Sequence, residues 1–221
     1  GCKGYNEKLV RSVSPDKVIS LFTRALDLNY EFNPQEPKTN ADTFIPYIRG
    51  RNTMQWGGLA DGFDDNEKEY GVSLELLQFF DSIDYPLSIS TKGTWWTKDP
   101  RYMDLFKKHA HNWHVKISIV TSNDIVASVL ERGVDSPKER FAAIKRLSDI
   151  GIHVTLRLRP YMIGISDDWR DTIMSAKEAG ADSVTTEFFC LEGRAEPKLR
   201  EKYKEISKLC GFDLWEIGRA S

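Results

Sequence analysis

Two adjacent glycines, Gly57 and Gly58, follow a short strand-like run at residues 53–56, and the acidic residue Asp61 comes shortly after them. Paired glycines after a strand allow the backbone to turn with positive φ and to come close to a ligand. Backbone carbonyls and a carboxylate are also the acceptors that an ammonium group needs. We therefore expect this turn to face a small molecule, although the glycines could also serve the turn alone.

Polar and charged residues follow four further segments that read as strands. Cations there could hold a carboxylate, carboxylates an ammonium group, and hydroxyls a ribose, so the set suits a zwitterionic, ribose-bearing small molecule. Taken singly, each charge also fits a solvated loop or an ion pair, and Glu187 could simply pair with Arg157 or Arg159. The four groups are Thr91-Lys92-Gly93-Thr94, Thr121-Ser122-Asn123-Asp124, Arg157-Leu158-Arg159-Pro160 and Glu187-Phe188-Phe189-Cys190.

Strands and helices are predicted to alternate along the chain, one βα unit in roughly thirty residues, which is typical of a parallel α/β fold. Right-handed crossovers place the carboxyl ends of all strands on one face, where such folds bind ligands. A flat doubly wound sheet and a curved partial barrel both fit this pattern. The expected strands are 53–56, 87–90, 115–119, 152–158 and 183–186. The expected helices begin at Ser14-Pro15, Ser73, Asp99-Pro100, Ser136-Pro137, Asp168 and Pro197, and residues 33–42 read as a surface loop.

The composition is that of a globular protein with balanced charge. The 221 residues include 31 basic and 33 acidic side chains, for a formal net charge of -2, which gives no support to a nucleic-acid partner. No apolar run approaches the roughly 20 residues of a membrane span. The 3 cysteines do not form a disulfide framework, so we expect a cytoplasmic protein in a reducing compartment and no membrane partner.

Several motifs, in their order along nearly the whole chain from Cys2 to Phe212, carry a family resemblance. The chain is similar to radical S-adenosylmethionine enzymes, and within them to the branch of spore photoproduct lyase and DNA repair photolyase-like proteins. The order of the motifs is more specific than any one of them. They are Gln55-Trp56-Gly57-Gly58-Leu59-Ala60-Asp61, Ser88-Ile89-Ser90-Thr91-Lys92, Lys116-Ile117-Ser118-Ile119-Val120-Thr121, Ser136-Pro137-Lys138-Glu139-Arg140 and Arg157-Leu158-Arg159-Pro160.

The resemblance implies a partial (β/α)6 TIM-like barrel of parallel strands that holds a 4Fe–4S cluster and S-adenosylmethionine. Reductive cleavage of this cofactor would give a 5′-deoxyadenosyl radical that abstracts hydrogen from a substrate, and the protein would place the reactants and exclude water. A reductant such as flavodoxin or ferredoxin is the implied partner. Gly57-Gly58, with Asp61 in the same motif, would meet the methionyl ammonium. Lys92, Ser118 and Arg157 or Arg159 would contact the carboxylate or ribose, Glu187 would approach the adenine, and Cys2 would bind the cluster.

The chain departs from this family at the cluster loop. The family carries three cysteines spaced CxxxCxxC after its first strand, whereas here only Cys2 precedes the first predicted helix, and the first strand is missing. Either the chain is a fragment cut within the loop, or it is a degenerate member without a cluster. The start at Gly1 favours the fragment. We accordingly expect residues 1–221 to form one radical S-adenosylmethionine core domain that lacks its first strand and most of the cluster loop.

Two other functions remain open at this point. One is a cluster-less α/β module that binds S-adenosylmethionine or a nucleotide without radical chemistry. The other is an ordinary TIM-barrel enzyme with Lys92 as a Schiff-base lysine. The sequence identifies neither the substrate nor a catalytic residue. Trp95 and Trp96 could stack on nucleic-acid bases, but a capping cluster over the barrel mouth is the interpretation we favour.

Overall fold

A computed structural model describes residues 13–37, 39–58, 60–131, 133–189 and, further on, 201, 203, 204, 206–208, 211 and 213. The chain divides into two compact units, one of residues 1–54 and 64–86 and the other of 55–63 and 87–221. That both form one domain over residues 1–221 stays a prediction. In the described part, no helix is long and apolar enough to cross a membrane.

The first unit is helical and is held by an aromatic core. The ring of Phe22 makes edge-to-face contacts with Phe80 and Tyr85, at centroid distances of 5.0 and 4.9 Å. Such contacts add to the burial of apolar surface that stabilises the unit. Its helices are α1 (Pro15–Leu26), the 3-10 helix η2 (Asn40–Phe44), α2 (Ile45–Arg49), α3 (Asp65–Tyr70) and α4 (Val72–Ser82).

Two predictions for this unit are corrected by the structure. Ser73 does not cap α4, because the helix begins one residue earlier and the Glu67 carboxylate accepts the N–H groups of Ser73 and Leu74 at 2.7 and 2.8 Å. The predicted loop ends early, since Asp42 lies in η2 and is only 1% exposed. Its carboxylate pairs with Arg24, which satisfies the charge inside the fold.

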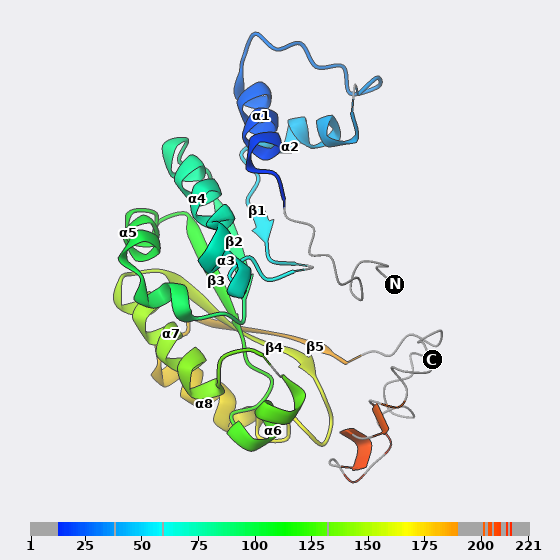
Figure 1. Ribbon diagram of the computed structural model, residues 1–221, viewed down its shortest axis with the longest axis vertical. Coiled ribbons are helices and arrows are strands. Elements are labelled where there is room, and N and C mark those ends of the chain that lie inside the picture. The colour runs from blue at the N-terminus through cyan, green and yellow to red at the C-terminus, as the bar shows by residue number, and fades with distance from the viewer. Residues whose placement is uncertain are drawn as a thin grey trace. The chain divides into compact units, whose positions relative to one another are not determined.

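The second unit is built on a sheet whose strands follow one another in the order β1-β2-β3-β4-β5, all parallel. This confirms the parallel α/β prediction and agrees with a partial TIM-like barrel (Figure 1). The strands are β1 (Met54–Trp56), β2 (Leu87–Thr91), β3 (Trp113–Ser118), β4 (His153–Tyr161) and β5 (Ser183–Phe188). The helices are η3 (Trp95–Lys98), α5 (Pro100–Lys108), α6 (Asp124–Leu130), α7 (Pro137–Asp149) and α8 (Trp169–Glu178).

The two faces of this sheet differ in chemistry. Alternate residues of β2, β3 and β4 are apolar and buried, and α7 packs on β3 and β4 while α8 packs on β4. The intervening residues are polar, which is unusual because parallel sheets between two helical layers are apolar on both faces. We call these intervening residues the polar face. They are Ser88 and Ser90 of β2, His114, Lys116 and Ser118 of β3, and His153, Thr155, Arg157 and Arg159 of β4.

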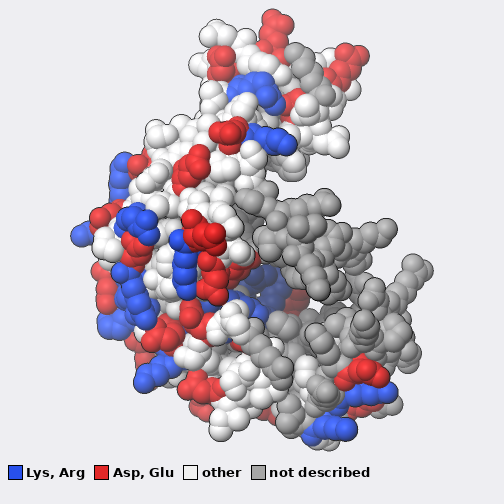
Figure 2. Space-filling model, in the orientation of Figure 1, with Lys and Arg blue, Asp and Glu red and all other residues white. Residues whose placement is uncertain are grey.

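Helix starts in this unit follow the predicted caps. The side chain of Asp99 accepts the N–H of Arg101 at 2.9 Å, and that of Ser136 accepts the N–H of Glu139 at 3.2 Å. The sequence analysis missed α6, whose cap Asn123 lies in a segment that it assigned to a ligand-facing strand end. The helix predicted from Pro197 lies largely outside the described residues. Figure 2 shows Lys and Arg interspersed with Asp and Glu on the visible face over α5 and α7.

The cap of α7 predicts a measurable loss of stability. Replacing Ser136→Ala should lower the free energy of unfolding by about 1 kcal/mol, because one N–H of the first turn loses its acceptor. Ser14→Ala is the matched control, since the Ser14 side chain makes no capping hydrogen bond to α1. Urea unfolding of the two variants measures the difference, and equal effects would contradict the assigned role of the Ser136 hydroxyl.

Candidate functional site

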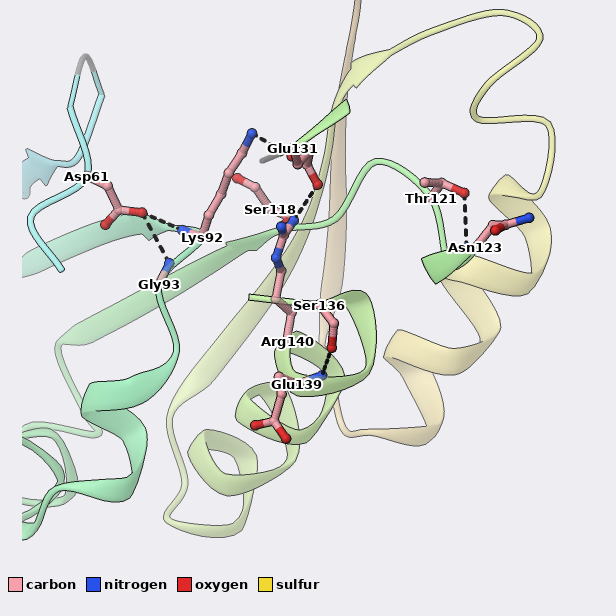
Figure 3. A network of polar contacts seen from close by, with 10 residues as sticks. All are labelled: Asp61, Lys92, Gly93, Ser118, Thr121, Asn123, Glu131, Ser136, Glu139 and Arg140. Atoms are coloured by element: carbon pink, nitrogen blue, oxygen red, sulfur yellow. Dashed lines mark hydrogen bonds and ion pairs between the residues drawn. The ribbon is translucent and has the colours of Figure 1, made fainter. Parts of the chain in front are cut away.

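The Asp61 carboxylate joins the glycine turn to the end of β2. One oxygen, Oδ2, accepts the N–H groups of Lys92 and Gly93 at 2.6 and 3.2 Å. The other, Oδ1, accepts the hydroxyl of Thr91 at 2.7 Å and the N–H of Phe63 at 3.0 Å. Both oxygens are therefore engaged within the chain, and Figure 3 shows the two contacts of Oδ2. The structure places Asp61 as a clamp that holds the turn, and any contact with a ligand is a further proposal.

The two glycines of the turn have different surroundings. Gly57 has φ +80°, and a Cβ there would lie 2.0 Å from the carbonyl oxygen of Ser90, so the fold itself requires glycine. A Cβ on Gly58 would meet no atom of the described residues within 4 Å. Gly57 thus lets the turn approach β2, whereas Gly58 leaves open space that a ligand can use.

Lys92 belongs to a short chain of charged groups on the same rim (Figure 3). Its Nζ lies 2.6 Å from Oε1 of Glu131, and Oε2 of Glu131 lies 2.6 Å from Nη1 of Arg140. Arg140 also donates to the carbonyl oxygen of Ser118 at 2.9 Å. The side chains of Arg140 and Glu131 are only 1% and 7% exposed, whereas that of Lys92 is 35% exposed. We call Lys92, Glu131 and Arg140 the charged triad.

Within the charged triad two cations share the Glu131 carboxylate, and the Asp61 carboxylate lies close by, where it accepts the N–H of Lys92. A buried charge is costly unless it is paired, so Arg140 and Glu131 must stay together. The accessible end of the triad is the Lys92 ammonium, which can attract an anion such as a carboxylate. The sequence analysis missed Glu131, because nothing in the local pattern pairs it with residues far along the chain.

The predicted arginines lie where alternation along β4 placed them. Arg157 is in register with Ser118 of β3 and Thr185 of β5, so these residues share one row of the sheet. Arg159 forms an ion pair with Glu187. Glu187 therefore has a partner inside the chain, which is one of the two interpretations that the sequence left open.

Positive charge gathers on the polar face. Burial lowers the pKa of the Lys116 ammonium, and the neighbouring Arg157 lowers it further. Burial and then Arg159 lower the pKa of Arg157. Burial also lowers the pKa of His114 to about 4, with smaller contributions from His153 and Lys116. Each group is thus harder to charge, chiefly because it is buried and to a lesser extent because cations lie near it.

Trp96 is part of the core, and Trp95 is half-buried beside it. Trp96 is fully buried, stacks on Phe63 at a centroid distance of 4.5 Å, and donates from Nε1 to the carbonyl oxygen of Gly93 at 2.9 Å. Trp95 donates from Nε1 to the carbonyl oxygen of Phe63 at 2.7 Å. Stacking of nucleic-acid bases on Trp96 is therefore wrong, since its ring faces are already packed against the chain, with Phe106 at 4.6 Å.

The strand end after β3 is tied to the start of α8. Oδ2 of Asp168 accepts the hydroxyl of Thr121 at 2.9 Å and both the N–H and the hydroxyl of Ser122, at 2.7 and 2.6 Å. These hydroxyls, which the sequence analysis placed among ligand-facing groups, thus hold a loop. Cys2, the predicted cluster ligand, lies outside the described residues, as do Cys190 and Cys210.

Comparison with known families gives one match. The sequence profile described as the radical SAM superfamily matches residues 8–184, which is most of the chain. That range includes the glycine turn, the charged triad and the polar face. No curated protein sequence matches the chain at a significant level.

The unequal glycines predict unequal substitution effects. Gly57→Ala should destabilise the protein by more than about 1 kcal/mol, because alanine must adopt a positive φ and its Cβ collides with a backbone oxygen. Gly58→Ala should change the stability by less than about 0.5 kcal/mol, since its Cβ enters open space. Denaturant midpoints measure both, and a Gly57→Ala variant as stable as Gly58→Ala would contradict the close approach.

The lowered pKa of His114 predicts that the stability of the fold depends on pH. Its pKa falls from 6.5 to about 4 on folding, so between these values the unfolded chain binds a proton that the folded chain does not. Stability should therefore fall as the pH drops from 6.5 towards 4. His114→Gln should weaken this dependence, whereas the exposed control His111→Gln should keep it. Urea unfolding at pH 7 and pH 5 makes the comparison, and an unchanged slope in His114→Gln would refute the assignment.

Proposed function

The chain belongs to the radical SAM superfamily, whose members are enzymes, and on that premise we propose that its strand-end rim binds S-adenosylmethionine. The superfamily is characterised by this cofactor and a 4Fe–4S cluster. The observation that carries the proposal is the partly exposed Lys92 ammonium of the charged triad, whose residue is tied by Asp61 to the glycine turn with open space at Gly58. A zwitterionic ligand needs both features, since its carboxylate requires a cation and its ammonium requires acceptors.

Each residue then has a defined role in holding the cofactor. The backbone at Gly57 and Gly58 would accept the methionyl ammonium, and Lys92 would bind the carboxylate. Asp61 would hold the turn in place rather than contact the cofactor directly, because both of its oxygens already accept hydrogen bonds from the chain.

The ribose and adenine would lie further along the sheet. Ser118 and Arg157 share a row of the polar face and would contact the ribose or the carboxylate. Arg159 would also contact the ribose or the carboxylate. Glu187, which forms an ion pair with Arg159, would lie on the adenine side. The donor set thus fits the cofactor, since it combines cations, a hydroxyl and acceptors on one rim.

The cluster is proposed on family grounds, with Cys2 as its one ligand in this chain. When bound, cluster and cofactor supply reductive cleavage of the sulfonium and a 5′-deoxyadenosyl radical that takes hydrogen from the substrate. The protein contributes placement and exclusion of water. A reductant of the flavodoxin or ferredoxin type, and membership of the branch that includes spore photoproduct lyase, remain proposals. A nucleic-acid substrate gains no support from the net charge of -2.

The Schiff-base alternative for Lys92 is disfavoured by its partner. Lysines that form Schiff bases are activated in apolar pockets or beside another cation. The Lys92 ammonium instead lies 2.6 Å from a carboxylate oxygen of Glu131. This geometry suits a lysine that stays charged and binds an anion.

Titration of the protein with S-adenosylmethionine in a calorimeter tests the pocket. Lys92→Met should weaken binding about tenfold to a hundredfold, because a charge-assisted hydrogen bond is lost. Lys107→Met, which removes an exposed cation at the end of α5, is the matched control and should leave the affinity unchanged. Gly58→Val should also weaken binding while the fold is kept. Equal affinity of Lys92→Met and Lys107→Met would refute the assigned role of Lys92.

Radical chemistry is tested separately from binding. After anaerobic reconstitution with iron and sulfide, reduction of the protein in the presence of S-adenosylmethionine should release 5′-deoxyadenosine. Tight binding without this product would support the cluster-less binding module instead. Absence of both would contradict the proposed function.

A further inference from the structure

We propose that Lys116, on the polar face of the sheet, binds a phosphate group of the substrate, a small phosphorylated molecule. The inference rests on the proposed function, because a substrate must reach the same face as the cofactor that reacts with it. Lys116 was part of a family motif in the sequence, but neither that motif nor the cofactor site gives it a role. Its environment is that of an anion site.

The charges of Lys116 and Arg157 favour an anion at this face. Lys116 donates from Nζ to the side-chain oxygen of Gln55 at 3.3 Å, a long contact with a neutral amide. Neither Lys116 nor Arg157 forms an ion pair within the part of the chain that the structure describes. Burial, followed by Arg157, lowers the pKa of the Lys116 ammonium, and burial, followed by Arg159, lowers the pKa of Arg157, which Glu187 in turn raises. Lys116 has no carboxylate among the groups that act on its pKa, and Arg157 has only Glu187, which also pairs with Arg159, so the two partly buried cations favour an added anion.

Hydroxyl groups also lie near Lys116. Parallel register places Ser90 of β2 and Thr155 of β4 directly beside it, so Ser90 is the neighbouring donor, whereas the Thr155 hydroxyl already contacts His114 Nε2 and the Ser183 hydroxyl, each at 2.7 Å. Neighbouring strands are about 4.8 Å apart, so side chains of one row can contact the same small group. Arg157 and Ser118 form the next row towards the carboxyl ends of the strands.

Lysine, arginine and hydroxyl donors from two adjacent rows suit an oxyanion with several oxygens. A carboxylate has two oxygens to satisfy, whereas a phosphate monoester has three that are free. The donors therefore match phosphate better. The buried Trp96 and the balanced surface charge favour a small molecule over a nucleic acid.

Lys116 is separated along the strands from Lys92, the cation proposed to bind the cofactor. Lys92 lies beyond the end of β2 and pairs with Glu131, whereas Lys116 lies within β3, in register with Ser90 inside β2. Lys116 is thus set back along the strands from the rim. A phosphate there would anchor a substrate that extends towards the strand ends, where the cofactor is proposed to lie. Arg157, on β4, lies one row closer to the carboxyl ends of the strands than Lys116.

Nuclear magnetic resonance of the ¹⁵N-labelled protein titrated with inorganic phosphate tests the inference. We expect shifts of amides in β3 and β4 with a dissociation constant on the order of millimolar. Lys116→Met should weaken binding about tenfold or more, and Lys107→Met should not. The spectrum of Lys116→Met reports whether the fold is kept, and Lys116→Arg, which restores the charge, should recover most of the affinity.

Titrations in saturating S-adenosylmethionine separate this inference from the proposed function. Phosphate should still bind, and Lys92→Met should reduce the affinity for S-adenosylmethionine without affecting that for phosphate. Binding of S-adenosylmethionine with no phosphate effect of Lys116→Met would overturn the inference alone. Phosphate binding that depends on Lys116, without S-adenosylmethionine binding, would overturn the proposed function alone. A short oligodeoxynucleotide that binds through Lys116 where inorganic phosphate does not would overturn the small-molecule assignment.

Discussion

The carboxylate of Asp61 holds the glycine turn and the end of β2 together, and the geometry of the rim depends on this contact. It accepts backbone N–H groups of Lys92 and Gly93, so it sets the point from which the Lys92 side chain leaves β2. Gly57 makes the contact possible because only glycine fits against the carbonyl oxygen of Ser90. Recognition of a ligand is then left to backbone acceptors and to cations.

Electrostatic balance distinguishes the polar face from the outer surface. On the outer surface, Lys98 of η3 pairs with Glu139 of α7, and Lys145 pairs with Asp149 within α7; exposed pairs of this kind contribute little to stability. The polar face instead carries Lys116 and Arg157 beside hydroxyls. Partly buried cations with few acidic neighbours favour the binding of an anionic ligand.

Local signals in the sequence predicted much of the fold. The roles of site residues that depend on contacts between distant parts of the chain could not be predicted in this way. Caps such as Asp99 and Ser136 were readable because they act within one turn of a helix. Alternation placed Arg157 and Arg159 on one face. Glu131 and the clamp role of Asp61 were not readable, because Lys92, which each of them contacts, lies far from both along the chain. The alternation of β3 also places Lys116 on the same face as Ser118, and this pattern could have identified Lys116 as a site residue from the sequence.

A crystal structure of the protein with S-adenosylmethionine would test the central claim most directly, because it shows where the cofactor lies. The account predicts the methionine carboxylate beside the Lys92 ammonium and the methionyl ammonium against the backbone at Gly57 and Gly58. Density for the cofactor elsewhere on the protein, or its absence at saturating concentration, would contradict the account.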